Sequence, residues 1–246
     1  MHVGWFQNHF REKIKDSKKI YIERGYSRIT NVFDKKEVLQ IRTASYELLK
    51  NIEKANPRLQ KTPRGNPALV FWPQDICPVM KNFAHDDRMK EIVRYYLGDK
   101  IFQLNNQVYY REAGDGDEFA WHQDICFRTP PQDYNNIEEN YLQTVIVVDD
   151  ILPGMGAIEF IPGSHKLGDL NLVPRDNSEK GLRKFVRNLW QGDKAYAQAG
   201  DILLWGPMVV HGSEQNVSDK NRMTYMNGFA TQDSVLNKKI FPVYEV

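Results

Sequence analysis

A histidine and an aspartate stand two positions apart in the sequence Trp-His-Gln-Asp, as His122 and Asp124. In an extended strand, side chains two apart point to one face, so this imidazole and carboxylate would lie together. A second histidine, His211, follows an apolar run far downstream. Two histidines and a carboxylate on one face, with coordination positions left open, suit non-haem Fe(II) and oxygen chemistry. Each residue alone also has a plainer reading, because His-x-Asp arises by chance and a single histidine is often a buried, hydrogen-bonded core residue.

Further motifs follow in an order and at spacings that together are specific. They are His122-Gln123-Asp124, Ile161-Pro162-Gly163-Ser164-His165, Gly200-Asp201, and His211-Gly212-Ser213 followed by Asn216, Ser218 and Arg222. This set resembles the phytanoyl-CoA dioxygenase family, whose members are Fe(II)- and 2-oxoglutarate-dependent oxygenases. The matching motifs run from about Gln107 to Phe229, and the first hundred residues resemble the family only in a general way.

The resemblance implies that His122, Asp124 and His211 bind the metal. They would hold Fe(II) on three neighbouring corners of an octahedron and leave positions for 2-oxoglutarate and O₂. The implied reaction converts 2-oxoglutarate to succinate and CO₂ and hydroxylates an unactivated C–H bond. Related iron halogenases replace the metal carboxylate with a small residue that lets chloride bind. The presence of Asp124 therefore argues against halogenation.

The resemblance also implies a set of residues that bind 2-oxoglutarate. Arg222 would bind the distal carboxylate, because a planar guanidinium matches a carboxylate with two parallel hydrogen bonds. Ser213, two residues after His211, would donate to the same carboxylate. Gln107 matches a family position beside the cosubstrate, and Thr144 is a further candidate from the facing strand. Arg111 stands where many members carry lysine, so the contacts with the cosubstrate differ in detail.

The substrate is defined less closely by the sequence. Trp72, Phe127, Arg128 and Trp205 are candidates to line its pocket, since three of them flank motif strands. Arg64 and Arg128 would suit a carboxylate, phosphate or phosphonate group, or they are ordinary surface charges. No basic footprint large enough for a fatty acyl-CoA is evident. We expect a small metabolite, such as an amino acid, an organophosphonate or a natural-product intermediate.

Two other functions compete with the oxygenase hypothesis. One is a non-catalytic jelly roll that binds sugars or partner proteins, which the intact metal triad and Arg222 argue against. The other is a cupin-type metalloenzyme that does not use 2-oxoglutarate. Cupin metal sites usually carry more histidines close together, whereas the first cluster here holds only His122.

The composition of the chain limits its domain organisation, its partners and its location. The chain of 246 residues has 41% hydrophobic and 26% charged residues, as expected for one soluble globular domain over residues 1–246. The net charge of +1 gives no attraction to nucleic acid or to an anionic membrane, and no apolar run approaches the length of a membrane span. Two cysteines, Cys77 and Cys126, do not form a disulfide framework, which favours the cytoplasm. The oligomeric state is left open.

The hydrophobic pattern changes near residue 100. Helical spacing predicts helices before it, and short strands separated by glycine and proline after it predict a sandwich or barrel. With the resemblance, we expect a mainly β fold with flanking helices: a double-stranded β-helix, or cupin-like jelly roll, over about 101–232, with the helical part, about 1–100, packed outside. The predicted helices cover residues 9–24, 34–55 and 86–97; the predicted strands cover 26–32, 101–111, 141–148, 157–161, 195–198, 202–205 and 222–231.

Two segments carry a specific expectation. In the strand at 101–111 the alternate residues Gln103, Asn105, Gln107, Tyr109 and Arg111 are polar, so this face is either exposed to solvent or turned into a polar cavity. The resemblance favours the cavity. The segment 125–140, which contains two consecutive prolines, is long and irregular enough to serve as a lid.

Overall fold

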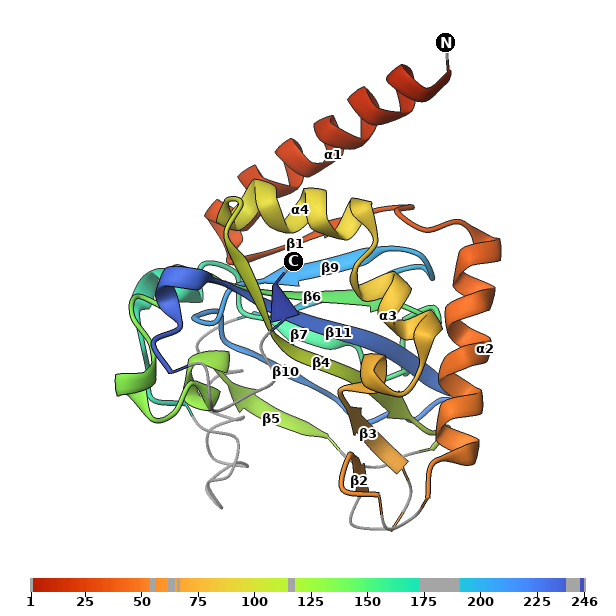
Figure 1. The fold of residues 1–246 in the computed structure, drawn as a ribbon. Helices are drawn as coiled ribbons and strands as arrows, with labels where there is room; N and C mark the ends of the chain where they lie inside the picture. Colours follow the sequence, from red (N-terminus) through yellow and green to blue (C-terminus); the bar gives the residue numbers. More distant parts are fainter. Residues whose placement is uncertain are drawn as a thin grey trace.

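Helices cover one side of the molecule (Figure 1). The computed structural model describes residues 2–53, 56–61, 65, 67–114, 118–172, 191–237 and 244–245. Within these ranges the α-helices are α1 (His2–Arg24), α2 (Lys35–Asn51), α3 (Pro78–Ala84) and α4 (Asp87–Leu97). The helix α2 begins as predicted at Asp34, whose carboxylate accepts from the backbone N–H of Glu37, while the Glu37 carboxylate accepts from the N–H of Asp34. The helix α4 likewise begins after an N-cap aspartate, Asp86.

The described strands form two antiparallel sheets. The larger has the order β1-β9-β6-β11-β4-β3-β2, with β12 also paired to β4. Its members are β1 (Tyr26–Ile29), β2 (Leu59–Lys61), β3 (Pro67–Phe71), β4 (Ile101–Arg111), β6 (Tyr141–Val147), β9 (Ile202–Trp205), β11 (Arg222–Thr231) and β12 (Tyr244–Glu245). The smaller has the order β5-β10-β7-β8, with β5 (Phe119–His122), β7 (Ile158–Phe160), β8 (Asp193–Lys194) and β10 (His211–Ser213). Two such sheets with helices outside confirm the predicted fold class.

Each face of the large sheet has its own core. On β6, Leu142 and Ile146 belong to the cluster that includes residues of α2, α3 and α4. The alternate residues Val145 and Val147 pack instead with Phe160 of the small sheet. Strand alternation therefore gives the large sheet an outer face toward the helices and an inner face toward the small sheet.

Several boundaries differ from the prediction. The strand expected at 195–198 is absent there: β8 ends at Lys194, and Ala197 forms only an isolated bridge with Ile151. The stretch 57–73, where no helix or strand is predicted, contains β2 and β3, and α3 is a further element that the sequence pattern does not predict. Proline and glycine dominate these segments locally, but pairing with β4 and packing on the sheet override that preference. None of the helices in the described ranges is long and apolar enough to cross a membrane.

The polar face of β4 is broken by a bulge. Gly228 of β11 pairs with Asn105, but the next residue, Phe229, pairs with Gln103, so one residue of β4 is extra. Gln103 is thereby turned to the outer face, where it hydrogen-bonds Asn227 and Gln74. The prediction that Gln103 shares the polar face is therefore wrong, because a sequence pattern of period two does not reveal a bulge.

Gln123 ties together the loops around the two histidine-bearing strands. Its side chain is fully buried, and its amide nitrogen donates to the carbonyls of Gly168 (2.9 Å) and Met208 (2.6 Å). Its amide oxygen accepts from the N–H of Leu170 at 2.7 Å. The side chain between His122 and Asp124 thus fixes the segments that precede β8 and β10.

We predict that Gln123→Ala lowers the free energy of unfolding by about 2–4 kcal/mol, because three partly buried backbone groups lose a neutral partner worth about 0.5–1.5 kcal/mol each. Urea denaturation followed by circular dichroism measures the change. The control is Gln132→Ala, at an exposed glutamine. Equal midpoints for the two variants would show that these bonds do not stabilise the fold.

Candidate metal centre

The small sheet brings the two histidines together. His122 ends β5 and His211 begins β10, and the two residues pair directly across the strands. Asp124 opens the 3₁₀-helix η2 (Asp124–Phe127), just beyond β5. Its Oδ1 lies 3.3 Å from Nε2 of His122 and 3.6 Å from Nε2 of His211. All three side chains are buried, and one donor atom from each lies within 4.8 Å of the others.

Backbone hydrogen bonds fix the state of both imidazoles. Nδ1 of His122 lies 2.8 Å from the carbonyl of Ala120, and Nδ1 of His211 lies 3.0 Å from that of Val209. A carbonyl only accepts, so each Nδ1 carries the proton and each Nε2 offers its lone pair. Burial, together with the neighbouring His122, lowers the pKa of His211 to about 4. His211 is therefore neutral near pH 7, as a metal ligand must be.

Trp205 determines which oxygen of Asp124 is available. The indole Nε1–H donates to Oδ2 of Asp124 at 2.8 Å, while Oδ1 faces the histidines. Trp205 is 1% exposed, and its ring packs between Phe160 and His211, with centroids 5.4 Å and 5.3 Å away. Burial alone would raise the pKa of Asp124, but His211 and His122 hold it well below its usual range. The sequence predicts Trp205 in the substrate pocket, whereas the structure places its indole N–H against the metal carboxylate.

Two arginines face each other on neighbouring strands of the large sheet. Arg222 at the start of β11 pairs with Arg111 at the end of β4, and both are buried. Nε of Arg222 is buried with no hydrogen-bond partner among the described residues. Burial, reinforced by Arg111, lowers the pKa of Arg222 to about 9. Arg222 lies four positions before Met226 on β11, and Met226 packs in the inner cluster, so the Arg222 side chain also belongs to the inner face. Such a buried, partnerless cation fits a bound anion.

Of the other residues predicted to bind the cosubstrate, two lie where they could reach the space between the sheets and one does not. Gln107 pairs with Met226 and therefore lies on the inner face. Ser213 is buried on β10, two positions from His211. Thr144 alternates with inner-face Val145, and its hydroxyl donates to the backbone carbonyl of Asn227 at 2.9 Å. The structure does not bring Thr144 to the inner face, and we leave it out of the proposed cosubstrate contacts.

The residues predicted to line the substrate pocket lie in different parts of the structure. The Phe127 ring is 40% exposed and lies 5.5 Å from the ring of His122. The guanidinium of Arg128 lies over the ring of Tyr141, 4.1 Å from its centroid. Trp72 stands beyond β3 in the left-handed region, with its N–H donating to the carbonyl of Asn106. Arg64 lies outside the described residues.

Sequence reasoning missed a polar group on β6. The hydroxyl of Tyr141 donates to Oε1 of Gln143 at 2.7 Å, and the amide of Asn105 donates to the same oxygen at 3.2 Å. The apolar character of the strand hid these residues, although positions 141, 143 and 145 alternate toward one face. Asn105, Gln107 and Tyr109 are partly exposed even though β4 is paired on both sides. Solvent therefore reaches the inner face of β4.

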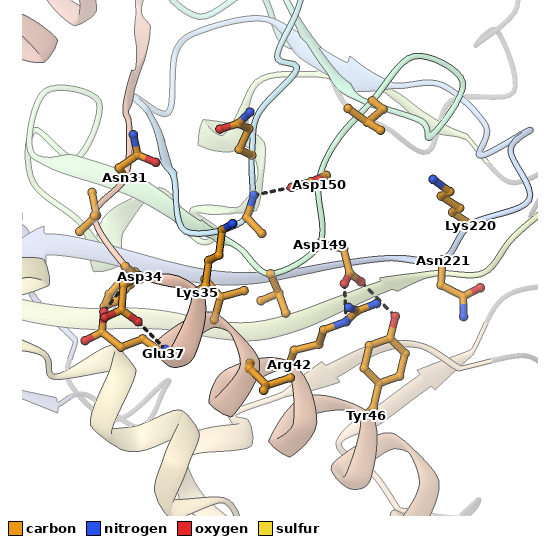
Figure 2. A pocket seen from close by; sticks show the side chains of 18 of the residues that line it. Asn31, Asp34, Lys35, Glu37, Arg42, Tyr46, Asp149, Asp150, Lys220 and Asn221 are labelled. Atoms are coloured by element: carbon orange, nitrogen blue, oxygen red, sulfur yellow. Dashed lines mark hydrogen bonds and ion pairs between the residues drawn. The ribbon is translucent and has the colours of Figure 1, made fainter.

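A separate cavity of about 1370 Å³ lies on the outside, between α2 and the loop after β6 (Figure 2). No metal ligand lines it. Its buried carboxylate, Asp149, is bound by Arg42 at 2.8 Å, by the hydroxyl of Tyr46 at 3.0 Å and by the N–H of Met223 at 2.9 Å. These contacts join α2 to β11, and each oxygen of Asp149 has a partner within the protein.

The fold and the three ligands define a jelly-roll oxygenase with a non-haem iron site and 2-oxoglutarate as cosubstrate. The phytanoyl-CoA dioxygenase (PhyH) family model matches residues 21–224, and the chain belongs to this family. The predicted family, the enzyme class and the cofactors Fe(II), 2-oxoglutarate and O₂ are thereby confirmed.

Known relatives are similar over most of their length. The probable alpha-ketoglutarate-dependent hypophosphite dioxygenase of Stutzerimonas stutzeri is 24% identical over 237 residues, covering 87% of this chain and 77% of the relative. The structure of EctD from S. alaskensis with 2-oxoglutarate and 5-hydroxyectoine has a TM-score of 0.75 and 20% identity, covering 88% and 75% of the two chains. That of the alpha ketoglutarate-dependent epimerase SnoN from nogalamycin biosynthesis has a TM-score of 0.71 and 19% identity, covering 90% and 84%.

We predict that Trp205→Phe weakens metal binding by roughly 10–100-fold, the usual effect of removing a group that orients a metal ligand. Phenylalanine keeps an aromatic ring but frees Oδ2 of Asp124 to turn. Calorimetric titration of the metal-free protein with Mn(II) under nitrogen measures the affinity. The control is Trp121→Phe, at a tryptophan that is equally buried but packs with Ile161 and Val210. Unchanged Mn(II) affinity in Trp205→Phe would contradict this role.

Proposed function

We propose that this protein hydroxylates an unactivated C–H bond of a small metabolite, consuming 2-oxoglutarate and O₂ and releasing succinate and CO₂. The observation that carries the proposal is the combination of His122, Asp124 and His211 around one point with the buried, partnerless Arg222 on the facing sheet. The first group has the donor set of an Fe(II) site with open positions. The second has the charge and planarity that a carboxylate requires.

The chain's own residues prepare this chemistry. His122 and His211 would bind iron through Nε2, and Asp124 through Oδ1, while Trp205 keeps Oδ2 engaged. Arg222, with Ser213 and Gln107, would hold the distal carboxylate of 2-oxoglutarate. The bound iron, 2-oxoglutarate and O₂ supply the oxidising power that breaks a C–H bond. The apolar residues Phe160 and Val145 exclude water from the side of the site away from the open face of β4.

The range of substrates among relatives supports a small molecule. The relatives described above are named for hypophosphite, for ectoine and for a natural-product pathway. The net charge of +1 gives no reason to expect nucleic acid as a substrate. We place the protein in the cytoplasm, because Cys77 and Cys126 are both free thiols.

Asp124 favours hydroxylation over halogenation. Once this carboxylate is bound to the metal, chloride has no coordination position beside 2-oxoglutarate and O₂. The carboxylate also offsets one of the two charges of Fe(II), which a bound anion would otherwise do. A dioxygenase independent of 2-oxoglutarate is disfavoured, because it leaves the buried Arg222 without a counter-ion.

We expect the wild-type protein, supplied with Fe(II), 2-oxoglutarate and a metabolite panel, to form succinate with at least one metabolite. Under ¹⁸O₂ with chloride present, mass spectrometry should find one ¹⁸O and no chlorine in the product. His122→Ala, Asp124→Ala and His211→Ala should each abolish turnover, whereas His9→Ala, at an exposed histidine of α1, should not. Chlorine in the product would refute the assignment, and a product with neither atom would indicate desaturation, ring closure or epimerisation.

Arg222→Ala should weaken 2-oxoglutarate binding by roughly 10²-fold or more, since losing one partner of a buried charge pair costs about 2–5 kcal/mol. Ser213→Ala should cost about tenfold or less, because a neutral hydrogen bond contributes about 0.5–1.5 kcal/mol. Calorimetry with the Mn(II)-loaded protein under nitrogen gives the affinity without turnover. Lys220→Ala, an exposed cation near the same strand, is the control. Normal binding by Arg222→Ala would transfer the role to Arg111.

A further inference from the structure

Arginines in this protein generally have carboxylate partners. Among the described residues, six form ion pairs: Arg11, Arg24, Arg28, Arg42, Arg58 and Arg88. Arg128 and Arg222 form none within the described ranges, and each has a buried Nε without a hydrogen-bond partner. Arg222 is accounted for by 2-oxoglutarate. Arg128 then remains as a second guanidinium whose Nε lacks a partner, while another part of the group interacts with the hydroxyl of Tyr134.

Arg128 is held close to the metal ligands. It caps η2, the single turn that begins at Asp124, and its backbone N–H donates to the carbonyl of Ile125 at 2.9 Å. It follows the metal carboxylate by four positions in the chain, with three residues between them. Its charge is also one of those that lower the pKa of Asp124. Its guanidinium carbon lies 4.1 Å from the centroid of the Tyr141 ring. A planar cation stacked on an aromatic ring presents its N–H groups at its edge, where an oxyanion can bind.

The tyrosine beneath Arg128 is itself fixed in place. Tyr141 is fully buried, and its hydroxyl is anchored on Gln143, which Asn105 also contacts. Gly228 lies against this hydroxyl so closely that an added Cβ would overlap it and would also crowd Asn105. The absence of a side chain at position 228 therefore makes room for Tyr141. Tyr141 and its polar neighbours therefore hold the ring in a fixed position beneath Arg128.

We propose that Arg128, stacked on Tyr141, binds an anionic group of the substrate, a carboxylate or a phosphonate-type oxyanion, next to the metal centre. This inference rests on the proposed function and names the class of its substrate. The edge of the guanidinium offers parallel N–H donors that match two oxygens of such a group. Gln143 is engaged by the Tyr141 hydroxyl, by the Asn105 amide and by the carbonyl of Thr144, so it holds the ring in place beneath Arg128. Anchoring the anion four residues from Asp124 would bring a nearby C–H bond to the metal.

The proposal makes a prediction about charge selection. A substrate whose anion is replaced by a neutral amide of the same shape should bind at least tenfold more weakly. The reason is that the amide leaves the partly buried guanidinium without a counter-ion. Arg128→Lys should retain part of the affinity, because lysine keeps the charge and loses the planar pair of donors.

The experiment uses the full chain loaded with Mn(II) and saturated with 2-oxoglutarate under nitrogen, so that the site at Arg222 is filled. The probes are methylphosphonate, observed by ³¹P relaxation, and propionate with its neutral analogue propionamide, observed by ¹H relaxation. We expect Mn(II) to enhance the relaxation of at least one oxyanion in the wild-type protein but not that of propionamide. The two oxyanion probes distinguish a phosphonate site from a carboxylate site.

Arg128→Gln should reduce this enhancement at least tenfold at equal probe concentration. Arg94→Gln, at an exposed arginine of α4, should leave it unchanged. The same enhancement in Arg128→Gln and wild type would overturn the proposal, because the probe would then bind the metal directly or elsewhere. Absence of enhancement in the wild type would also overturn it. Calorimetry with 2-oxoglutarate on the same samples tests the proposed function separately, since that affinity depends on Arg222 and not on Arg128.

Discussion

The pairing of β5 with β10 is the constraint on which the site depends. It places His122 directly opposite His211, and the ladder sets the distance between the two imidazoles without any help from the metal. Asp124 completes the group because η2 turns the chain immediately after β5. Trp205, reaching across from the large sheet, then holds the carboxylate through Oδ2. The ligands are thus preorganised by backbone pairing and by one hydrogen bond between the sheets.

The two faces of the large sheet have different roles: the outer face stabilises the fold and the inner face carries residues of the site. Its outer face packs against α2, α3 and α4 in an apolar cluster, with Ile41, Met80 and Ile92 fully buried. Its inner face carries the polar side chains of β4 and the arginines Arg111 and Arg222. Burial of the Arg222 guanidinium, whose Nε has no hydrogen-bond partner among the described residues, is unfavourable until an anion arrives. Apolar packing on the outer face stabilises the fold enough to offset this cost. The folded protein can therefore keep its anion-binding arginine buried before the anion binds.

Charge also organises the inner face. Asp124 is a buried carboxylate just beyond β5 of the small sheet, while Arg222 and Arg128 form no ion pair among the described residues. Such a distribution suits a reaction that assembles a metal cation, a dicarboxylate cosubstrate and an anionic substrate in one place. It differs from the outside cavity of Figure 2, where Asp149 is fully engaged by Arg42, Tyr46 and the backbone of β11.

The sequence by itself determined the metal ligands, the jelly-roll class, the caps at Asp34 and Asp86, and the inward direction of Gln107. The helix starts follow from a local rule, helix capping, whereas the ligands, the jelly-roll class and the inward direction of Gln107 follow from the family resemblance of motifs at fixed spacing. Tertiary structure alone decided the roles of Gln103, Thr144, Trp205 and Tyr141. A bulge in β4 turned Gln103 outward, the alternation of β6 did the same to Thr144, and packing between sheets brought Trp205 behind Asp124 and Tyr141 beneath Arg128. These outcomes depend on register and on contacts between residues far apart in the chain, which a local pattern does not encode.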